Sequence, residues 1–542
     1  MDVQARKMTA GQVRRALWTL GVLAAVVLGF ILRLKGIHNP LLDHPGWRQG
    51  DEASIARNFA TLRYNIFYPQ TNYNGPPPNY VELELQIVPY LAATFYKIFG
   101  VHEIAGRIIT IAFSLGTAAV LALFGRWLFA SATAGILAAL FYAVMPGSIY
   151  YGRTFMPDTA MVFFMTAALY ATARLLLDRE RWRVRDVLTC AALLALALLA
   201  KPVAAVAIVP VLVLIAERAY SGRTFRPLSA VALVAGPLIV LWIYDRIVGS
   251  HAEWHWASGI LTLHVLPSLR ESLQSVGAFG VKAAQFRLML GVLAYVMIGP
   301  AIAAAALLGL FFTPATSRSR SLLWAWLAAG LAYVFVVVTV ERVDYYTFPL
   351  LPLAALAAAG FTQRLIAAVG SSTLSAAAKY ACAALALAAF AATVFQNYQI
   401  VKPYYRYSKS VYRNAIALDR VLPPAALVVM GHYDPSVLYY IARYGWEEDP
   451  YVWTPFDEQS AIRKGARYFI AIERNRFNRN VELCAWMQRF PLLRTGAQWP
   501  VYVTDPNLVE PKADGQWRAF RNAEKQGHAR DWLSARGLCS NA

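Results

Sequence analysis

The chain has 542 residues, of which 58% are hydrophobic and only 15% are charged. Soluble domains usually carry about 25% charged residues, so this composition excludes an ordinary soluble enzyme. The formal net charge is +20, but no basic stretch interleaved with aromatic residues stands out, and we expect no nucleic-acid partner.

Apolar segments of membrane-spanning length begin near the N-terminus. They cover Leu17–Leu32, Ile108–Leu123, Ala160–Leu177, Val231–Ile243, Leu322–Val340 and Ala381–Phe395. Segments of roughly 20 apolar residues are typical of helices that cross a bilayer. Arg6, Lys7, Arg14 and Arg15 precede the first segment, which places the N-terminus inside. No small-x-small cleavage site follows, so we interpret this segment as an uncleaved first helix.

The loop after this helix, residues 36–103, is therefore predicted to lie outside. Its apolar part, Ile87–Phe99, is short and contains Pro89, which indicates an interfacial or re-entrant helix. Spans are expected next at 104–125, 132–150 and 159–177. The following stretch, Val187–Ala216, lies between two basic loops and is interrupted by Lys201-Pro202. Because basic loops mark the inside, this stretch predicts a hairpin of two short helices with Lys201 near its outer apex.

Further spans are expected at 227–247, 288–312, 321–340, 347–364 and 379–397, which makes about eleven helices with the C-terminus outside. After residue 397, charged residues, Asn, Pro and aromatics become frequent. Strands are predicted at Ala425–Met430, Tyr468–Ile472 and Val501–Val503, and helices at Val411–Arg420, Ser436–Arg443 and Asp457–Lys464. The predicted fold is mainly α: a polytopic membrane helix bundle over 1–397, with an extracytoplasmic C-terminal α/β domain over 398–542.

This topology collects polar residues at the outer face of the membrane, where they are candidates for function because burying them there is costly. They are Asp51, Glu52, Glu84, Arg153, Asp158, Lys201, His251, His255, Arg342, Tyr345 and Tyr346. In the C-terminal domain, Cys484 and Cys539 are candidates for a disulfide if the compartment is oxidising.

Each candidate has a structural alternative. The pair Asp51-Glu52 suits either the start of a helix or a general base that acts on an acceptor hydroxyl. Asp158 follows Pro157 and suits an N-cap, and Arg153 could pair with it or bind an anion. Lys201 would cost about 2.5–3.5 kcal/mol at mid-membrane, so it either snorkels outward or meets a lipid phosphate.

The remaining candidates carry weaker signals. Arg342 suits the phosphate of a lipid donor, whereas Tyr345 and Tyr346 are also ordinary interfacial anchors. His251 and His255 suggest a metal only weakly, because no third ligand is obvious. We therefore assign no metal and no other cofactor.

Several motifs occur in an order that resembles glycosyltransferase family 39 of the GT-C class, which includes protein O-mannosyltransferases and is similar to the lipid A aminoarabinose transferases. The motifs are WRQGDEASIARNF, NIFYPQ, VELELQIVPYLAATFYKIFG, MPGSIYYGRTFMPDTAMVFF, LLAKP, DYYTFPLLPLAALAAAG and PSVLYYIARYGW. The resemblance implies that Asp51 is the base and Asp158 the second acid. It also matches Glu84 to the glutamate before the loop helix and Lys201 to the hairpin lysine.

The chain departs from this family at three positions. Glu84-Leu85-Gln86 lacks the loop lysine that often follows the glutamate, Pro202 replaces the usual glycine, and Asp344 replaces a frequent histidine. These departures concern the identity of the sugar and the acceptor more than the reaction type.

The sequence thus predicts a multi-pass glycosyltransferase of the cytoplasmic (inner) membrane. It would move a sugar from a polyprenyl-phosphate carrier to a hydroxyl of a lipid, glycan or protein, with inversion at the anomeric carbon. Arg153, Lys201 and Arg342 would offset the charge on the leaving phosphate. Two alternatives remain: a polysaccharide polymerase or ligase with a lipid-diphosphate donor, and a lipid or glycan transporter without enzymatic activity.

Overall fold

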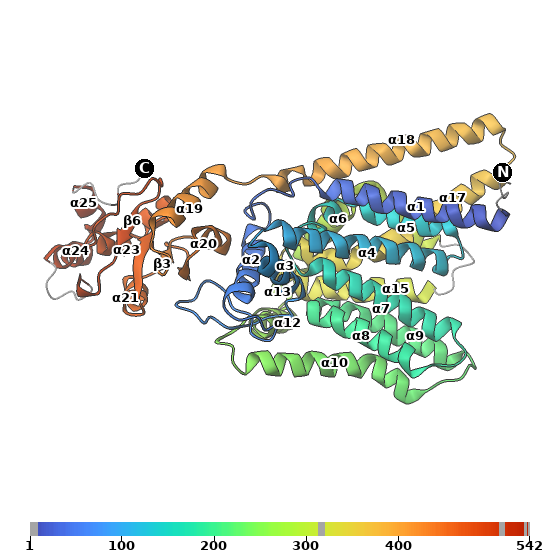
Figure 1. Cartoon of the computed structure of the whole chain (residues 1–542), viewed down its shortest axis with the longest axis horizontal. Helices are drawn as coiled ribbons and strands as arrows, with labels where there is room; N and C mark the ends of the chain where they lie inside the picture. Colours follow the sequence, from blue (N-terminus) through green and yellow to red (C-terminus); the bar gives the residue numbers. More distant parts are fainter. Residues whose placement is uncertain (1–8, 313–319, 509–514, 536–538, 540–542) are drawn as a thin grey trace, which may run out of the picture.

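A computed structural model of the chain describes residues 9–312, 320–508, 515–535 and 539. Within these residues, nine helices are long and apolar enough to cross a membrane, and three more apolar helices are shorter. Figure 1 shows most of them side by side in one bundle, with the N-terminus at one end and the C-terminal unit beyond the other. The expected number of about eleven spans stays a prediction, because it depends on whether the shorter apolar helices also cross the membrane.

The first half of the bundle follows the predicted elements closely. Its helices are α1 (Ala10–Arg33), α2 (Gly46–Thr61), α3 (Ile87–Phe99), α4 (Ile104–Leu128), α5 (Ala132–Val144), α6 (Pro146–Tyr151), α7 (Asp158–Asp178), α8 (Val184–Ala200), α9 (Ile208–Tyr220) and α10 (Pro227–Gly249). The single span expected at 132–150 is wrong, because a new helix starts at Pro146. Proline lacks the backbone N–H that a continuing helix needs and is favoured in a first turn.

The break at Lys201 is present as predicted. The 3-10 turn η1 (Pro202–Ala207) separates α8 from α9, and Lys201 itself has an extended backbone with φ of −166°. The ends of this break lie near the start of α7, since α7 packs against α8, η1 and α9. A lysine is thereby presented at a helix end inside a largely apolar bundle.

The second half of the bundle is less regular than expected. Its elements are β2 (Trp254–His255), α11 (Ala257–Gly259), η2 (Ile260–Val265), α12 (Leu266–Gln274), α13 (Val276–Val292), η3 (Leu293–Ile298), α14 (Pro300–Phe311), α15 (Arg320–Tyr333), η4 (Val334–Val338), α16 (Thr339–Glu341), η5 (Asp344–Leu350), α17 (Leu351–Ser371) and α18 (Ala376–Val401). The span expected at 288–312 is broken at Gly299, whose φ of +89° favours glycine, and Pro300 follows it.

The C-terminal unit contains a four-stranded sheet in the order β4-β3-β5-β6. Its elements are η6 (Lys402–Tyr405), α19 (Lys409–Val421), β3 (Leu427–Met430), α20 (Pro435–Ile441), β4 (Tyr444–Glu447), α21 (Pro455–Arg463), β5 (Ala466–Ile470), α22 (Arg474–Arg479), α23 (Val481–Met487), β6 (Val501–Val503), η7 (Pro506–Leu508), α24 (Gly515–Lys525) and α25 (Ala529–Ser534). The strand β3 is parallel to β4 and β5, whereas β6 is antiparallel to β5. The predicted domain boundary at 397 falls inside helix α18, which continues to Val401. The boundary itself stays a prediction.

The C-terminal unit docks on the first loop through its helix α20 and strand β4. Tyr440 accepts a hydrogen bond from the backbone of Leu41 at 2.6 Å, and the Tyr444 hydroxyl donates to Asn58 at 2.6 Å. The backbone N–H of Gly75 donates to Gly445 at 2.7 Å. In Figure 1, α2 and α3 lie at the end of the bundle that faces this unit. The first loop is thus enclosed between the helices and the sheet.

Candidate active site

Helix α2 carries the acids Asp51 and Glu52 together with Arg48. Residues three and four apart share one helix face, so Arg48 lies beside both acids. Its guanidinium is 2.9 Å from Glu52 and also pairs with Glu84, which comes from the end of the first loop. Because α2 begins at Gly46, the interpretation of Asp51-Glu52 as a helix start is wrong. The acids lie in the second turn, where helix capping does not explain them.

Asp51 is buried, with 1% of its surface exposed, and has one specific hydrogen-bond donor. The hydroxyl of Tyr73 donates to its Oδ1 at 2.7 Å. Burial raises the pKa of Asp51 to about 7, although Arg48 and the Tyr73 hydrogen bond favour the charged form. A carboxyl with a pKa near neutrality can both accept and release a proton, which is what general base catalysis requires.

Glu52 is completely buried, and apart from its ion pair with Arg48 neither of its oxygens has a hydrogen-bond partner among the described residues. Burial raises its pKa to about 8, opposed by Arg48 and reinforced by the negative charges of Glu84, Asp51 and Asp158. The first-loop acids and Asp158 therefore lie close enough to influence one another. Asp51, Glu52, Glu84 and Asp158, the four predicted acids, thus lie near one another in the fold.

Lys201 and Asp158 form a buried ion pair at the start of α7. The ammonium lies 2.8 Å from Asp158 Oδ1, and the two residues are 6% and 1% exposed. The ammonium also lies 4.9 Å and 4.5 Å from the ring centroids of Tyr345 and Tyr346. Aromatic faces attract cations. From the sequence, Lys201 was expected either to snorkel outward or to contact a lipid phosphate. The structure adds a third contact, the carboxylate of Asp158.

Arg153 is not brought to this cluster. Its guanidinium is fully buried and bonds to Asp43 at 2.5 Å and to the backbone of Gly36 at 3.1 Å. Arg107 approaches the other oxygen of Asp43 at 3.2 Å. The pairing of Arg153 with Asp158 is therefore wrong, and the geometry gives Arg153 the role of fastening the first loop to the bundle.

The other candidates lie at the edge of the site or outside it. Arg342 is exposed, with a φ of +55°, and follows α16 directly before the segment with the two tyrosines. His251 contacts the backbone of Phe67 at 2.7 Å and stacks on Tyr68, while His255 pairs with Glu82 in a short parallel bridge. No group of three His, Cys, Asp or Glu side chains suited to a metal occurs in the described part of the chain. Cys484 and Cys539 form a disulfide, with their Cα atoms 6.0 Å apart.

Sequence reasoning missed three features of the site. Arg48 could have been found from its spacing to the two acids. Tyr73 could not, because it lies in an irregular loop 22 positions after Asp51. Asp344 accepts hydrogen bonds from the hydroxyls of Tyr151 and Tyr404, each at 2.6 Å, and no local pattern indicates that pairing.

Comparisons with known proteins agree with this architecture. Residues 86–244 match the family model described as dolichyl-phosphate-mannose-protein mannosyltransferase. The fold is similar to ArnT from Cupriavidus metallidurans in the apo state, at 14% identity and a TM-score of 0.54, over 92% of this chain and 100% of that one. It is also similar to the oligosaccharyltransferase AglB from Archaeoglobus fulgidus, at 12% identity and a TM-score of 0.54, over 93% of this chain and 77% of that one.

A further structure of the Archaeoglobus fulgidus oligosaccharyltransferase, in the apo form, aligns at 13% identity and a TM-score of 0.56, over 91% of this chain and 72% of that one. No curated protein sequence matches the chain. At these identities the likeness establishes the fold. The chain has the fold of GT-C membrane glycosyltransferases, which confirms the predicted resemblance and the predicted membrane helix bundle.

Proposed function

We propose that this chain transfers a sugar from a polyprenyl-phosphate carrier to a hydroxyl acceptor at the outer face of a cytoplasmic membrane. The observation that carries the proposal is Asp51, a buried carboxyl with a pKa of about 7; the adjacent Glu52 is influenced by the charge of Asp158, which pairs with the buried Lys201. Such a displacement needs a proton acceptor and a cation within the same site. The carboxyl takes the hydroxyl proton, and the cation stabilises the leaving phosphate.

The acceptor oxygen attacks the anomeric carbon from the face opposite the phosphate, so the configuration inverts. Its proton passes to Asp51, whose orientation the Tyr73 hydroxyl fixes at 2.7 Å. The bond between the anomeric carbon and the phosphate oxygen breaks. The electron pair stays on that oxygen, and the phosphate leaves attached to the carrier lipid. Lys201 would turn from Asp158 toward that phosphate, and the exposed Arg342 adds a second positive charge.

The structural neighbours support a lipid-phosphate donor. One ArnT structure from Cupriavidus metallidurans holds undecaprenyl phosphate, and one AglB structure from Archaeoglobus fulgidus holds dolichol-phosphate and an inhibitory peptide. The two neighbours thus share a lipid phosphate as ligand.

The substitution Asp51→Asn tests the assignment of the base. Asparagine keeps the shape but cannot accept a proton, so the transfer rate should fall by about 10²–10⁴-fold. Transfer of labelled sugar is measured in membranes, with circular dichroism and a thermal midpoint as evidence of folding. Asp186→Asn is the control, since Asp186 lies in the first turn of α8, at the end of that helix away from Lys201. A folded Asp51→Asn protein that transfers sugar at the wild-type rate would rule out Asp51 as the base.

A further inference from the structure

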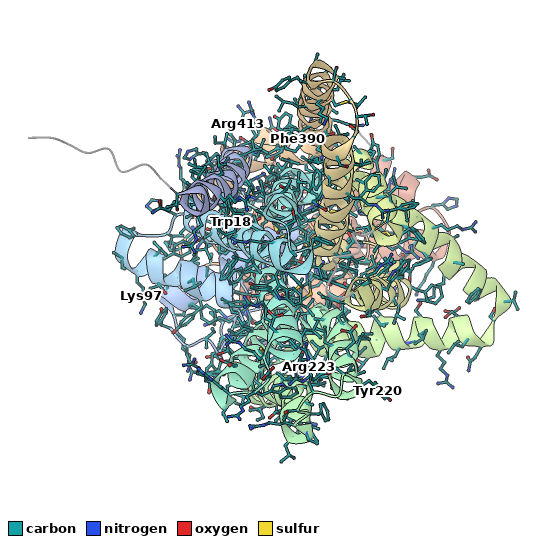
Figure 2. The ribbon with its side chains drawn as sticks, turned by 90° about the vertical axis from the view of Figure 1, so that its right-hand side faces the viewer. Trp18, Lys97, Tyr220, Arg223, Phe390 and Arg413 are labelled. Atoms are coloured by element: carbon teal, nitrogen blue, oxygen red, sulfur yellow. A yellow bond between two sulfur atoms is a disulfide. The ribbon has the colours of Figure 1, made fainter. Side chains whose placement is uncertain are left out.

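A basic cavity lies at the end of the bundle opposite the candidate active site, where α1 begins and α4 ends. Its lining consists of Arg14, Arg15, Trp18, Arg126, Ala130 and Ala132. The volume is about 300 Å³, which is at the lower limit for sites that hold small ligands. Figure 2 views the molecule from this end and shows Trp18 on α1. The charge-based topology places this end at the inner surface of the membrane.

Helical spacing explains how the cavity forms. Arg14 and Arg15 precede Trp18 by four and three residues, so all three share one face of α1. Arg126 lies in the last turn of α4, which packs against α1. The guanidinium of Arg126 lies 4.8 Å from the Trp18 ring centroid, so the ring holds this cation at the cavity.

The described residues do not neutralise the positive charge of the cavity. None of its three arginines has a carboxylate within salt-bridge distance among the described residues, and none of the lining residues is acidic. The indole N–H of Trp18 is buried and likewise lacks a hydrogen-bond acceptor in the described part of the chain. Buried donors are almost always satisfied by protein, water or ligand, so this N–H points to a missing acceptor.

We propose that this cavity binds the headgroup of an anionic phospholipid of the inner leaflet. Arginine suits phosphate because its donors match the geometry of phosphate oxygens. Basic pockets between helices at the cytoplasmic side are a known way of holding anionic lipids. The excess of basic residues that sets membrane orientation would by itself place arginines on this side. It does not explain why these arginines line one cavity, or why a buried indole N–H lies beside them.

The position of the cavity favours a phospholipid over a free phosphate as the ligand. Past Trp18 the exposed side chains of α1 are mostly apolar, including Leu20, Leu23 and Val27 at 61%, 52% and 53% exposure, so acyl chains can lie along the helix below a bound headgroup. A free phosphate would use the arginines without the apolar surface. The two sources therefore differ in whether the acyl chains contribute to binding.

The test uses the purified full-length protein and its double variant Arg15→Gln/Arg126→Gln. Native mass spectrometry measures retention of phosphatidylglycerol, and a thermal midpoint is recorded with phosphatidylglycerol, phosphatidylcholine or inorganic phosphate. The wild type should retain phosphatidylglycerol and show a higher midpoint with it than with phosphatidylcholine. The double variant should lose most of that retention, at least fivefold, and most of that shift.

Arg223→Gln is the matched control, because Arg223 is an exposed arginine on the same predicted membrane side but not at the cavity. Figure 2 labels it on the loop after α9. Unchanged phosphatidylglycerol retention in the double variant would overturn the proposal. An equal loss in Arg223→Gln would overturn it as well, since the binding would then reflect general surface charge. An equal midpoint shift with inorganic phosphate would replace the lipid by a free anion.

Discussion

Asp51 and Lys201 divide the proposed chemistry between a proton acceptor and a phosphate partner. Each is buried, and each already has a protein contact, Tyr73 for Asp51 and Asp158 for Lys201. Charged groups in such surroundings are costly unless paired. The pairing keeps both groups in place before substrate arrives, and the donor phosphate offers Lys201 a competing anion.

The raised pKa of Asp51 predicts how activity depends on pH. The base must be ionised, so its active fraction falls as the pH drops below about 7 and rises as the pH increases through that value. The ratio kcat/KM for the acceptor should show an acid limb near pH 7. It is measured with purified protein between pH 5 and 9, with thermal midpoints at each pH. A limb near pH 4, the ordinary range of an aspartate, would contradict the burial argument.

Lys201→Met should weaken binding of undecaprenyl phosphate by about tenfold or more, because a desolvated cation near a phosphate contributes on the order of 1.5–3 kcal/mol. Removing the lysine alone also leaves Asp158 unpaired, so Lys201→Met/Asp158→Asn is compared as a variant without the buried charge. Lys97→Met is the control, since Lys97 lies on α3 over the Tyr64 ring. Equal lipid affinity in the wild type and both Lys201 variants would remove Lys201 from the donor site.

At the scale of elements, the contact between α2 and α20 holds the base against the C-terminal unit. Gly50 directly precedes Asp51, and a Cβ at this position would overlap the backbone of Ser436 on α20. The guanidinium of Arg57, about two turns after Gly50, lies 3.8 Å from the Tyr439 ring centroid and donates to the Tyr439 carbonyl at 3.1 Å. The position of α2 therefore depends on the docked sheet as much as on the membrane helices.

Gly50→Ala should lower the thermal midpoint and reduce transfer, because overpacking costs about 1–3 kcal/mol and displaces Asp51. Gly236→Ala on α10 is the matched control, since no atom lies within 4 Å of a Cβ there. That substitution should leave stability unchanged or slightly increased, by up to about 1 kcal/mol. Differential scanning fluorimetry and the transfer assay compare the two. Equal behaviour of both variants would show that the α2–α20 contact is looser than the structure indicates.

Most of these elements were predictable from local patterns, and the exceptions have identifiable causes. Long apolar runs and the break at Lys201-Pro202 are local signals, so the bundle and the hairpin were accessible. The division of the segment 132–150 at Pro146 was missed because hydropathy dominates that stretch. Strand β4 was missed because Tyr444–Glu447 contains Gly445, whose φ of +154° and contact with Gly75 arise from tertiary docking.

The candidate acids could be selected from the sequence, but their pairings could not. Asp51, Glu52, Glu84 and Asp158 were found from topology and family resemblance. The partners of Arg153 and Asp51 are contributed by Asp43 and Tyr73, which no spacing rule connects to them. Which charge pairs with which is a property of the folded loop.

At the scale of the whole molecule, the bundle separates the two proposed sites. The candidate active site and the C-terminal unit lie at one end, and the start of α1 lies at the other (Figure 1). Single cysteines test the predicted orientation in a background where Cys190 and Cys382 are replaced by Ala. A membrane-impermeant maleimide should label Arg413→Cys on α19 in intact cells and label Arg223→Cys only after the cells are opened. The reverse pattern would contradict the topology derived from charge.

Sugar transfer from a polyprenyl-phosphate carrier to a hydroxyl acceptor is tested most directly with purified protein in vesicles. The assay contains a labelled polyprenyl-phosphate sugar and increasing amounts of a cell-envelope extract as the source of acceptor. The account predicts that label moves from the carrier to a hydroxylated acceptor, with inversion at the anomeric carbon and at a rate that Asp51→Asn lowers by about 10²–10⁴-fold. Label that crosses the bilayer while still attached to its carrier would contradict the account and favour a transporter.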